Sequence, residues 1–207
     1  MFRLICICLG YLVGMVQTAY IIGKVMARID IRDFGSGNAG TTNTIRVLGP
    51  KAGIMVFLCD IIKGGLAFTL CAVLFNGSGS FLMGSSVLPG VYGGLGAILG
   101  HCFPFYLKFK GGKGMAAAIG LMLCLDVKSA LIAYAVGIAT VAVTRYISLA
   151  TLIVIAIYPV ILWLFKFEIE CIMVLFVIAC LIWYLHRANI GRLLKGTENK
   201  FNFKKQV

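Results

Sequence analysis

The segment "GSGNAGTTNTIR", residues 35–46, gathers an unusual number of hydrogen-bond donors in an apolar chain. Its glycines allow backbone N–H groups to turn toward an anion, and a terminal arginine can bind a phosphate through two parallel hydrogen bonds. A solvated turn has a similar composition, but a short loop between apolar segments does not need so many converging donors. The segment therefore favours phosphate binding, with these candidate ligands: Ser36, Gly37, Asn38, Asn43 and Arg46.

A second polar segment, "GHCFPFYLKFKGGKGMAAAIG", spans residues 100–120. We expect its glycines, Gly111, Gly112 and Gly114, to form a loop around Lys113, with a helix starting near Lys113. Backbone N–H groups at a helix start form an anion site. A nucleotide-binding P-loop requires serine or threonine after the lysine, where this chain has Gly114, which disfavours a nucleoside triphosphatase.

The third polar segment, "HRANIGRLLKGTE", spans residues 186–198. On a helix, His186, Asn189 and Arg192 share one face, and Glu198 follows in a turn. A basic helix lying on lipid is the alternative interpretation, but such a helix has no need of the glutamate. Ser148 in "TRYIS" is a weaker candidate, since a serine at a span end is often a cap.

Asp60 and Lys63 interrupt an otherwise apolar run, where a charge near the bilayer centre would cost about 3 kcal/mol. Their spacing places both on one helix face, so they can form an ion pair or serve the substrate directly. Either way, this face should point into the helix bundle or a wet cavity. His101, one of only two histidines, is a structural or supporting residue.

The chain that must position these residues has 207 residues, of which 61% are hydrophobic and 13% charged. This composition indicates an all-α integral membrane protein. The length leaves no room for a separate soluble domain, so 1–207 is expected to be one domain. We interpret seven apolar runs as membrane spans: 2–23, 52–75, 81–103, 114–125, 129–143, 147–165 and 169–185. The alternative to seven spans is five full spans with shorter or re-entrant pieces.

The formal net charge is +12, and most lysines and arginines fall in the loops on one side of this seven-span arrangement. The other side carries only Arg3, Lys128 and Lys166. The positive-inside rule then predicts that the N-terminus is outside and the C-terminus is cytoplasmic. All three polar segments thereby lie at the cytoplasmic face, where basic residues also meet anionic lipid, and no nucleic-acid partner is expected.

The eight cysteines are scattered mainly through apolar runs without any C-x-x-C spacing. They are interpreted as small buried hydrophobic residues rather than zinc ligands or disulfides.

Together, the three polar segments resemble the three cytoplasmic motifs of the bacterial acyl-phosphate:glycerol-3-phosphate acyltransferase family, in the same order and with similar spacing. The similarity runs from the first span to about Lys200. It implies a seven-span enzyme of the bacterial inner membrane that moves a fatty acyl group from acyl phosphate to the 1-hydroxyl of sn-glycerol 3-phosphate. The products are lysophosphatidic acid and inorganic phosphate, in the first step of phospholipid synthesis. The resemblance also implies no metal and no cofactor, and we expect the protein to function as a monomer.

The resemblance assigns roles to individual residues. It makes the Gly111–Gly114 loop the site for the donor's phosphate. His186 and Asn189 line the acyl-transfer centre, and Glu198 matches the acid of the third motif. By the same resemblance, the expected ligands of glycerol phosphate are Ser36, Asn38, Arg46, Lys113 and Ser148.

The sequence departs from the family pattern at Ala39, Thr41 and Ala117, which should alter loop rigidity and leave the reaction unchanged. Because an acyl phosphate has a good leaving group, the protein must mainly neutralise two phosphates, align the hydroxyl and stabilise the oxyanion. We expect direct transfer, with His186 or the substrate's own phosphate accepting the hydroxyl proton.

Two other classes of protein would share part of this pattern. A transporter of a small phosphorylated solute should carry polar residues through the membrane, yet later spans such as "LATLIVIAIYPVILWLF" have almost none. A lipid-binding scaffold would need the basic residues but not the glycine loops.

Overall fold

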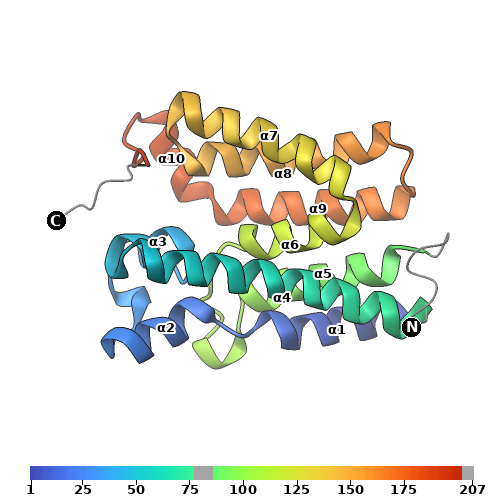
Figure 1. Cartoon of the computed structure of the whole chain (residues 1–207), viewed down its shortest axis with the longest axis horizontal. Helices are drawn as coiled ribbons and strands as arrows, with labels where there is room; N and C mark the ends of the chain where they lie inside the picture. Colours follow the sequence, from blue (N-terminus) through green and yellow to red (C-terminus); the bar gives the residue numbers. More distant parts are fainter. Residues whose placement is uncertain (77–85, 202–207) are drawn as a thin grey trace. The chain divides into compact units, whose positions relative to one another are not determined.

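The computed structural model describes residues 1–76 and 86–201, and every regular element within these ranges is a helix (Figure 1). The predicted all-α class is thereby confirmed. The α-helices are α1 (Phe2–Gly14), α2 (Thr18–Ala27), α3 (Thr41–Leu48), α4 (Pro50–Asn76), α5 (Leu88–Cys102), α6 (Met115–Leu125), α7 (Val127–Thr144), α8 (Ile147–Leu164), α9 (Ile169–Leu185) and α10 (Arg187–Leu194). Within the same ranges, the short 3-10 turns η1 (Ile31–Asp33) and η3 (Phe105–Leu107) lie in the connections.

Among the described residues, four helical segments are long and apolar enough to cross a membrane. A bent pair, α9 with α10 at an angle of 61°, makes a fifth if it is counted as one span. α5 and α6 are shorter, with 15 and 11 residues. The number of seven spans therefore stays a prediction. The four segments are Phe2–Ala27, Pro50–Asn76, Val127–Thr144 and Ile147–Leu164.

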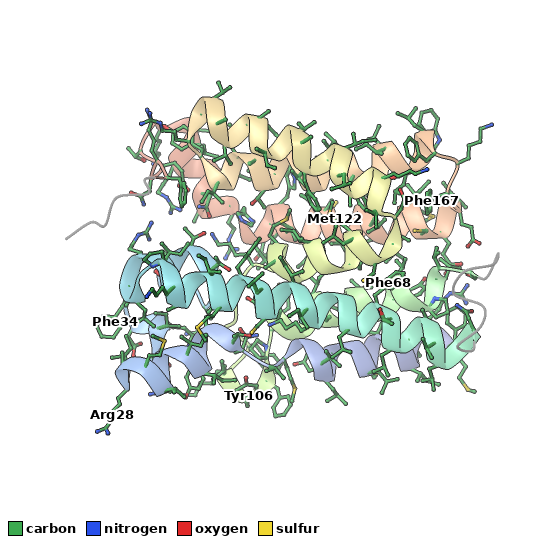
Figure 2. The ribbon with its side chains drawn as sticks, viewed as in Figure 1. Arg28, Phe34, Phe68, Tyr106, Met122 and Phe167 are labelled. Atoms are coloured by element: carbon green, nitrogen blue, oxygen red, sulfur yellow. The ribbon has the colours of Figure 1, made fainter. Side chains whose placement is uncertain are left out.

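The described residues divide into two compact units, 1–125 and 126–201, and each is described by itself. In the first unit, Phe68 and Met122 are buried, whereas the exposed Arg28 and Phe34 project outward near α2 and α3 (Figure 2). In the second unit, α8 packs against α7 and α9. Asp126 starts that unit by capping α7, since its carboxylate accepts a 2.7 Å hydrogen bond from the Ser129 amide.

Glycines allow α1 and α5 to pack with their backbones in contact. A Cβ on Gly96 would overlap the Ile7 carbonyl, and one on Gly100 would overlap the Tyr11 carbonyl. Gly10 on α1 meets the Gly93 carbonyl in the same way. Gly96 and Gly100, spaced four residues apart, therefore allow the two helix backbones to approach closely.

Two expectations about element boundaries need correction. The first apolar run, expected to be continuous over 2–23, is interrupted between α1 and α2 at residues 15–17. The segment 35–46 was expected to be a loop, but its second half belongs to α3. The third apolar run was predicted to begin at 81, and its first five residues lie outside the described residues.

Candidate active site

The turn before α3 is organised by Asn43, which is buried. Its side-chain oxygen accepts hydrogen bonds from the Ser36 amide at 2.7 Å and the Ser36 hydroxyl at 3.1 Å. Its side-chain nitrogen donates to the carbonyls of Ile31 and Phe34, both at 3.0 Å. Because both donor protons are used in this way, Asn43 holds the turn in shape, a role different from the ligand role predicted for it.

The other predicted ligands of this segment are more accessible: Ser36, Gly37 and Arg46 are exposed, and Asn38 is half-buried. Gly37 adopts a φ of +70°, which favours glycine. The Arg46 guanidinium is therefore accessible to a solute, whereas the Ser36 hydroxyl, although exposed, donates its proton to Asn43.

The backbone amides of Gly111 and Gly112, in the second polar segment, are both hydrogen-bonded within the protein. The amide of Gly111 donates to the Cys102 carbonyl at 3.1 Å, and that of Gly112 donates to the His101 carbonyl at 3.0 Å. These two N–H groups are bound to the end of α5, so the loop cannot present them to an anion as the glycine pattern suggested.

The anion-binding capacity of this segment lies instead at the start of α6. Gly114 has a φ of +85° and precedes the first helical residue, Met115. The first helical hydrogen bond, at 2.9 Å, joins the Ala118 amide to the Gly114 carbonyl. The N–H groups of residues 115–117 therefore have no acceptor within the helix. The positive end of the helix dipole lies beside Lys113 in the chain.

The two polar segments touch at Ala39 and Gly112. A Cβ on Gly112 would lie 2.8 Å from the Ala39 carbonyl oxygen. α3 begins at Thr41 and α6 at Met115, two and three residues beyond this contact. The N-terminal ends of α3 and α6, which are the positive ends of their dipoles, therefore lie close together in the first unit.

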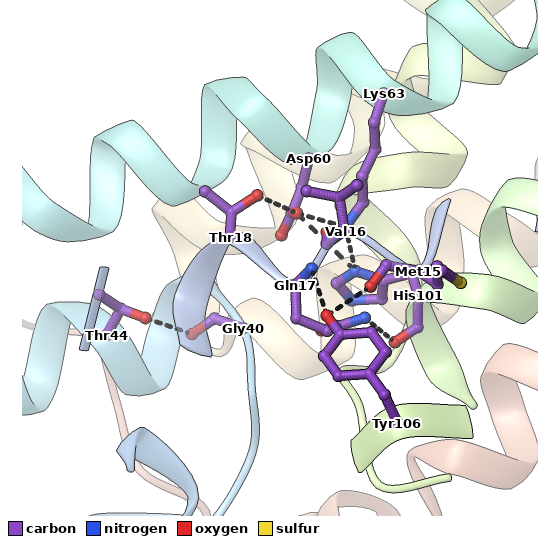
Figure 3. A network of polar contacts seen from close by, with 10 residues as sticks. All are labelled: Met15, Val16, Gln17, Thr18, Gly40, Thr44, Asp60, Lys63, His101 and Tyr106. Carbon is purple, nitrogen blue, oxygen red and sulfur yellow. Dashed lines mark hydrogen bonds and ion pairs between the residues drawn. The ribbon is translucent and has the colours of Figure 1, made fainter. Parts of the chain in front are cut away.

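Asp60, Lys63 and His101 form a buried polar network, drawn in Figure 3. The Lys63 ammonium lies 2.7 Å from an Asp60 carboxylate oxygen and 2.8 Å from Nδ1 of His101. The predicted ion pair is confirmed, as is its burial: the exposed fractions of the two side chains are 2% for Asp60 and 7% for Lys63.

Arg32 is a residue that the sequence analysis missed as a site residue. Its guanidinium pairs with Asp30 at 2.6 Å and donates to the carbonyls of Leu107 at 3.0 Å and Lys110 at 3.2 Å. The hydrogen bond from Arg32 holds the pKa of Asp30 below its usual range. The D-x-R spacing suggests this pair, but nothing in the sequence reveals its reach to residues 107–110.

In the second unit, the Glu198 carboxylate brings together three predicted residues. It accepts hydrogen bonds from the Ser148 hydroxyl at 2.9 Å, the Asn189 amide at 2.7 Å and the Arg192 guanidinium at 2.6 Å. Burial raises the pKa of Glu198, but these three hydrogen bonds and the charge of Arg192 outweigh burial, and the pKa lies below its usual value.

His186 lies at the bend between α9 and α10 and is buried. Its Nδ1 lies 2.8 Å from the Ile182 carbonyl oxygen, an atom that can only accept, so the proton is on Nδ1 and the basic nitrogen is Nε2. His186 immediately precedes α10, and Asn189 lies within its first turn.

Comparisons with known proteins agree on one family. The family model described as glycerol-3-phosphate acyltransferase matches residues 4–196. Glycerol-3-phosphate acyltransferase of Clostridioides difficile is 42% identical over 198 residues, covering 95% of this chain and 94% of that protein. The enzyme of Shouchella clausii is also 42% identical, with 94% of each chain covered.

Two solved structures are similar over nearly the whole chain. Both are crystal structures of PlsY (YgiH), an integral membrane glycerol 3-phosphate acyltransferase. The glycerol 3-phosphate form has a TM-score of 0.85 and 36% identity, covering 97% of this chain and 96% of that one. The lysophosphatidic acid form has a TM-score of 0.83 and 35% identity, with the same coverage.

The fold and these matches define an integral membrane acyltransferase. The chain belongs to the glycerol-3-phosphate acyltransferase family. The resemblance of the three polar segments is thereby confirmed, and the transporter alternative is not favoured.

Proposed function

We propose that this chain transfers a fatty acyl group from acyl phosphate to the 1-hydroxyl of sn-glycerol 3-phosphate, releasing inorganic phosphate and lysophosphatidic acid. The observation that carries the proposal is the contact of Ala39 with Gly112, beside which α3 and α6 begin. Each helix start contributes roughly half a positive charge, and Lys113, two residues before α6, adds a full charge. Arg46, which is exposed in the last turn of α3, is proposed as a second cationic ligand. Such a site suits the phosphate groups of the two substrates.

The reaction needs little covalent help from the protein. The substrate hydroxyl attacks the acyl carbonyl carbon, the bond from that carbon to the phosphate oxygen breaks, and the hydroxyl proton moves to a base. Ser148 is a poor candidate for a covalent nucleophile, because its hydroxyl donates to Glu198, whose lowered pKa makes that carboxylate a weak base. We therefore propose direct transfer.

Two acceptors suit the hydroxyl proton: Nε2 of His186 and a phosphate oxygen of the substrate. His186 fits because the Ile182 carbonyl holds its other ring nitrogen in the protonated form. Asn189, beside it at the start of α10, is proposed to line the same transfer centre. Glu198 positions Asn189, Ser148 and Arg192, so its role is to hold ligands in place.

The proposal extends to the membrane arrangement. We infer a seven-span monomer of the bacterial inner membrane, with its N-terminus outside and its active site at the cytoplasmic face. The helices that coincide with the apolar runs and the one-sided distribution of lysine and arginine support it. A C-terminal fusion to green fluorescent protein should fluoresce, whereas a C-terminal alkaline phosphatase fusion should be inactive. The reverse pattern would contradict this orientation.

The choice of donor is tested with purified protein in detergent. Glycerol 3-phosphate is offered with palmitoyl phosphate, with palmitoyl-CoA or with palmitoyl acyl carrier protein at equal concentrations. Of these three donors, only palmitoyl phosphate should give lysophosphatidic acid. Equal rates with palmitoyl-CoA would refute the acyl phosphate donor while leaving the acyltransferase assignment intact.

A further inference from the structure

We propose that Asp60, Lys63 and His101 are positioning residues of the glycine loop: the buried ion pair fixes the His101 imidazole against Gly112 and thereby places Lys113 and the start of α6. This inference rests on the proposed phosphate-binding role of Lys113 and the start of α6.

The Lys63 ammonium has three protons and no acceptor. Three acceptors surround it: Asp60 at 2.7 Å, the Val16 carbonyl at 2.8 Å and Nδ1 of His101 at 2.8 Å. Each proton therefore has its own acceptor. Lys63 has no donor left for a substrate, which decides between the two roles that its sequence position allowed.

Because an ammonium can only donate, Nδ1 of His101 must accept, and the imidazole proton must be on Nε2. The opposite edge of the ring reaches the glycine loop, since a Cβ on Gly112 would overlap Nε2. The His101 carbonyl also accepts the Gly112 amide at 3.0 Å. His101 thus holds Gly112 through both its ring and its backbone.

The network reaches its surroundings through the interruption between α1 and α2 (Figure 3). The carbonyls that this interruption exposes are bound by Lys63 at Val16 and by the Tyr106 hydroxyl at Met15, the latter at 2.8 Å. Gln17 donates to the His101 carbonyl at 2.8 Å. One buried charge pair therefore joins the interruption, α4 and the end of α5 directly beneath the loop.

A buried ion pair contributes little net stability compared with apolar packing. Apolar residues at 60 and 63 would fold α4 equally well but would leave the Val16 carbonyl and the His101 ring without a donor. The positions of these donors, more than the stability of the pair, account for two charges in an apolar helix.

The test uses His101→Asn, Gly112→Ala and the double variant in the purified full-length protein. Asparagine keeps an acceptor for Lys63 but removes the ring edge that contacts Gly112. Gly112→Ala should raise the KM of one phosphate substrate about 10-fold, and His101→Asn should raise the KM of that same substrate about 5-fold, with kcat changed less than about twofold. The double variant should be no worse than Gly112→Ala alone, because both disturb one contact.

The inference would be overturned if the two increases in KM multiplied in the double variant, or if His101→Asn left KM unchanged. Wild-type protein that makes no lysophosphatidic acid would instead refute the proposed function.

A further variant, Lys63→Met, should show the same raised KM as His101→Asn. Its control is Lys128→Met, at an exposed lysine outside the network, which should keep wild-type kinetics.

A measurement on the wild-type protein does not depend on any variant folding. The chain has only two histidines, and they are expected to be opposite tautomers, with the proton on Nε2 in His101 and on Nδ1 in His186. Nitrogen-15 NMR of histidine-labelled protein distinguishes the two, with His186→Gln assigning the signals. A proton on Nδ1 of His101 would contradict the network.

Discussion

The Ser148 hydroxyl donates a 2.9 Å hydrogen bond to the Glu198 carboxylate, which lies 50 positions later in the chain. Asn189 and Arg192 bind the same carboxylate, so a single acid organises the polar end of the second unit. The side chain of Glu198 is only 7% exposed, and this makes its charge costly to leave unpaired.

Replacing Glu198 by glutamine should lower stability by about 1–2 kcal/mol, because the amide presents no charge to Arg192. Thermal unfolding in detergent measures the loss. Arg187→Gln is the control, since Arg187 is exposed and its guanidinium bonds the Tyr184 carbonyl and lies over the Tyr184 ring. An unchanged melting temperature in Glu198→Gln would remove the organising role.

The lowered pKa of Glu198 makes this contribution depend on pH. A carboxyl whose folded pKa is depressed stabilises the fold fully above its ordinary value of 4.5 and loses that contribution as the pH falls through the folded pKa. When the pH is lowered from about 6 to about 3.5, the melting temperature of the wild-type protein should fall further than that of Glu198→Gln. Parallel curves for the two proteins would contradict the assignment.

Removing either proposed phosphate ligand should damage catalysis without unfolding the protein. Arg46→Ala and Lys113→Ala should each lower kcat/KM by about 100-fold or more, because each deletes a charge facing a developing phosphate charge. Size-exclusion chromatography confirms the folded state, and Lys51→Ala, at an exposed lysine just after α3, is the control. Rates within about twofold of wild type would remove the residue concerned from the site.

His186→Gln distinguishes the two proton acceptors. If Nε2 of His186 is the base, kcat should fall by about 100-fold or more, and the acidic limb of the pH–rate profile should disappear. A variant with full activity and an unchanged profile would assign the proton to the substrate phosphate.

Close packing of α1 on α5 predicts that Gly96→Ala destabilises the first unit, since the new Cβ would overlap the Ile7 carbonyl. We expect a loss of about 2–3 kcal/mol, measured by thermal unfolding. Gly191→Ala is the matched control, because a Cβ there meets nothing within 4 Å and alanine favours the helix by about 1 kcal/mol. Equal effects of the two substitutions would contradict the packing.

The sequence predicts the helices well because long apolar runs in a membrane chain have few alternatives to helix. The interruption at residues 15–17 is not predicted, because Gln17 and Thr18 are only weak breaks in a largely apolar run. The groups that satisfy the carbonyls there, Lys63 and Tyr106, are distant in sequence. α3 escapes prediction for the opposite reason: its polar composition resembles a loop, although Gly49, with a φ of +90°, marks its end.

The candidate site, too, could be predicted from the sequence only in part. Residue types alone single out Arg46, Lys113 and the Asp60–Lys63 pair. Spacing cannot reveal that the amides of Gly111 and Gly112 bind the end of α5, or that Arg32 reaches the carbonyls of residues 107 and 110, because both depend on contacts between distant segments.

The central claim is acyl transfer between two phosphate-bearing substrates. Purified protein given palmitoyl phosphate should release inorganic phosphate only when glycerol 3-phosphate is present, in a one-to-one ratio with lysophosphatidic acid. Phosphate release that is independent of glycerol 3-phosphate, or that occurs without lysophosphatidic acid, would contradict it.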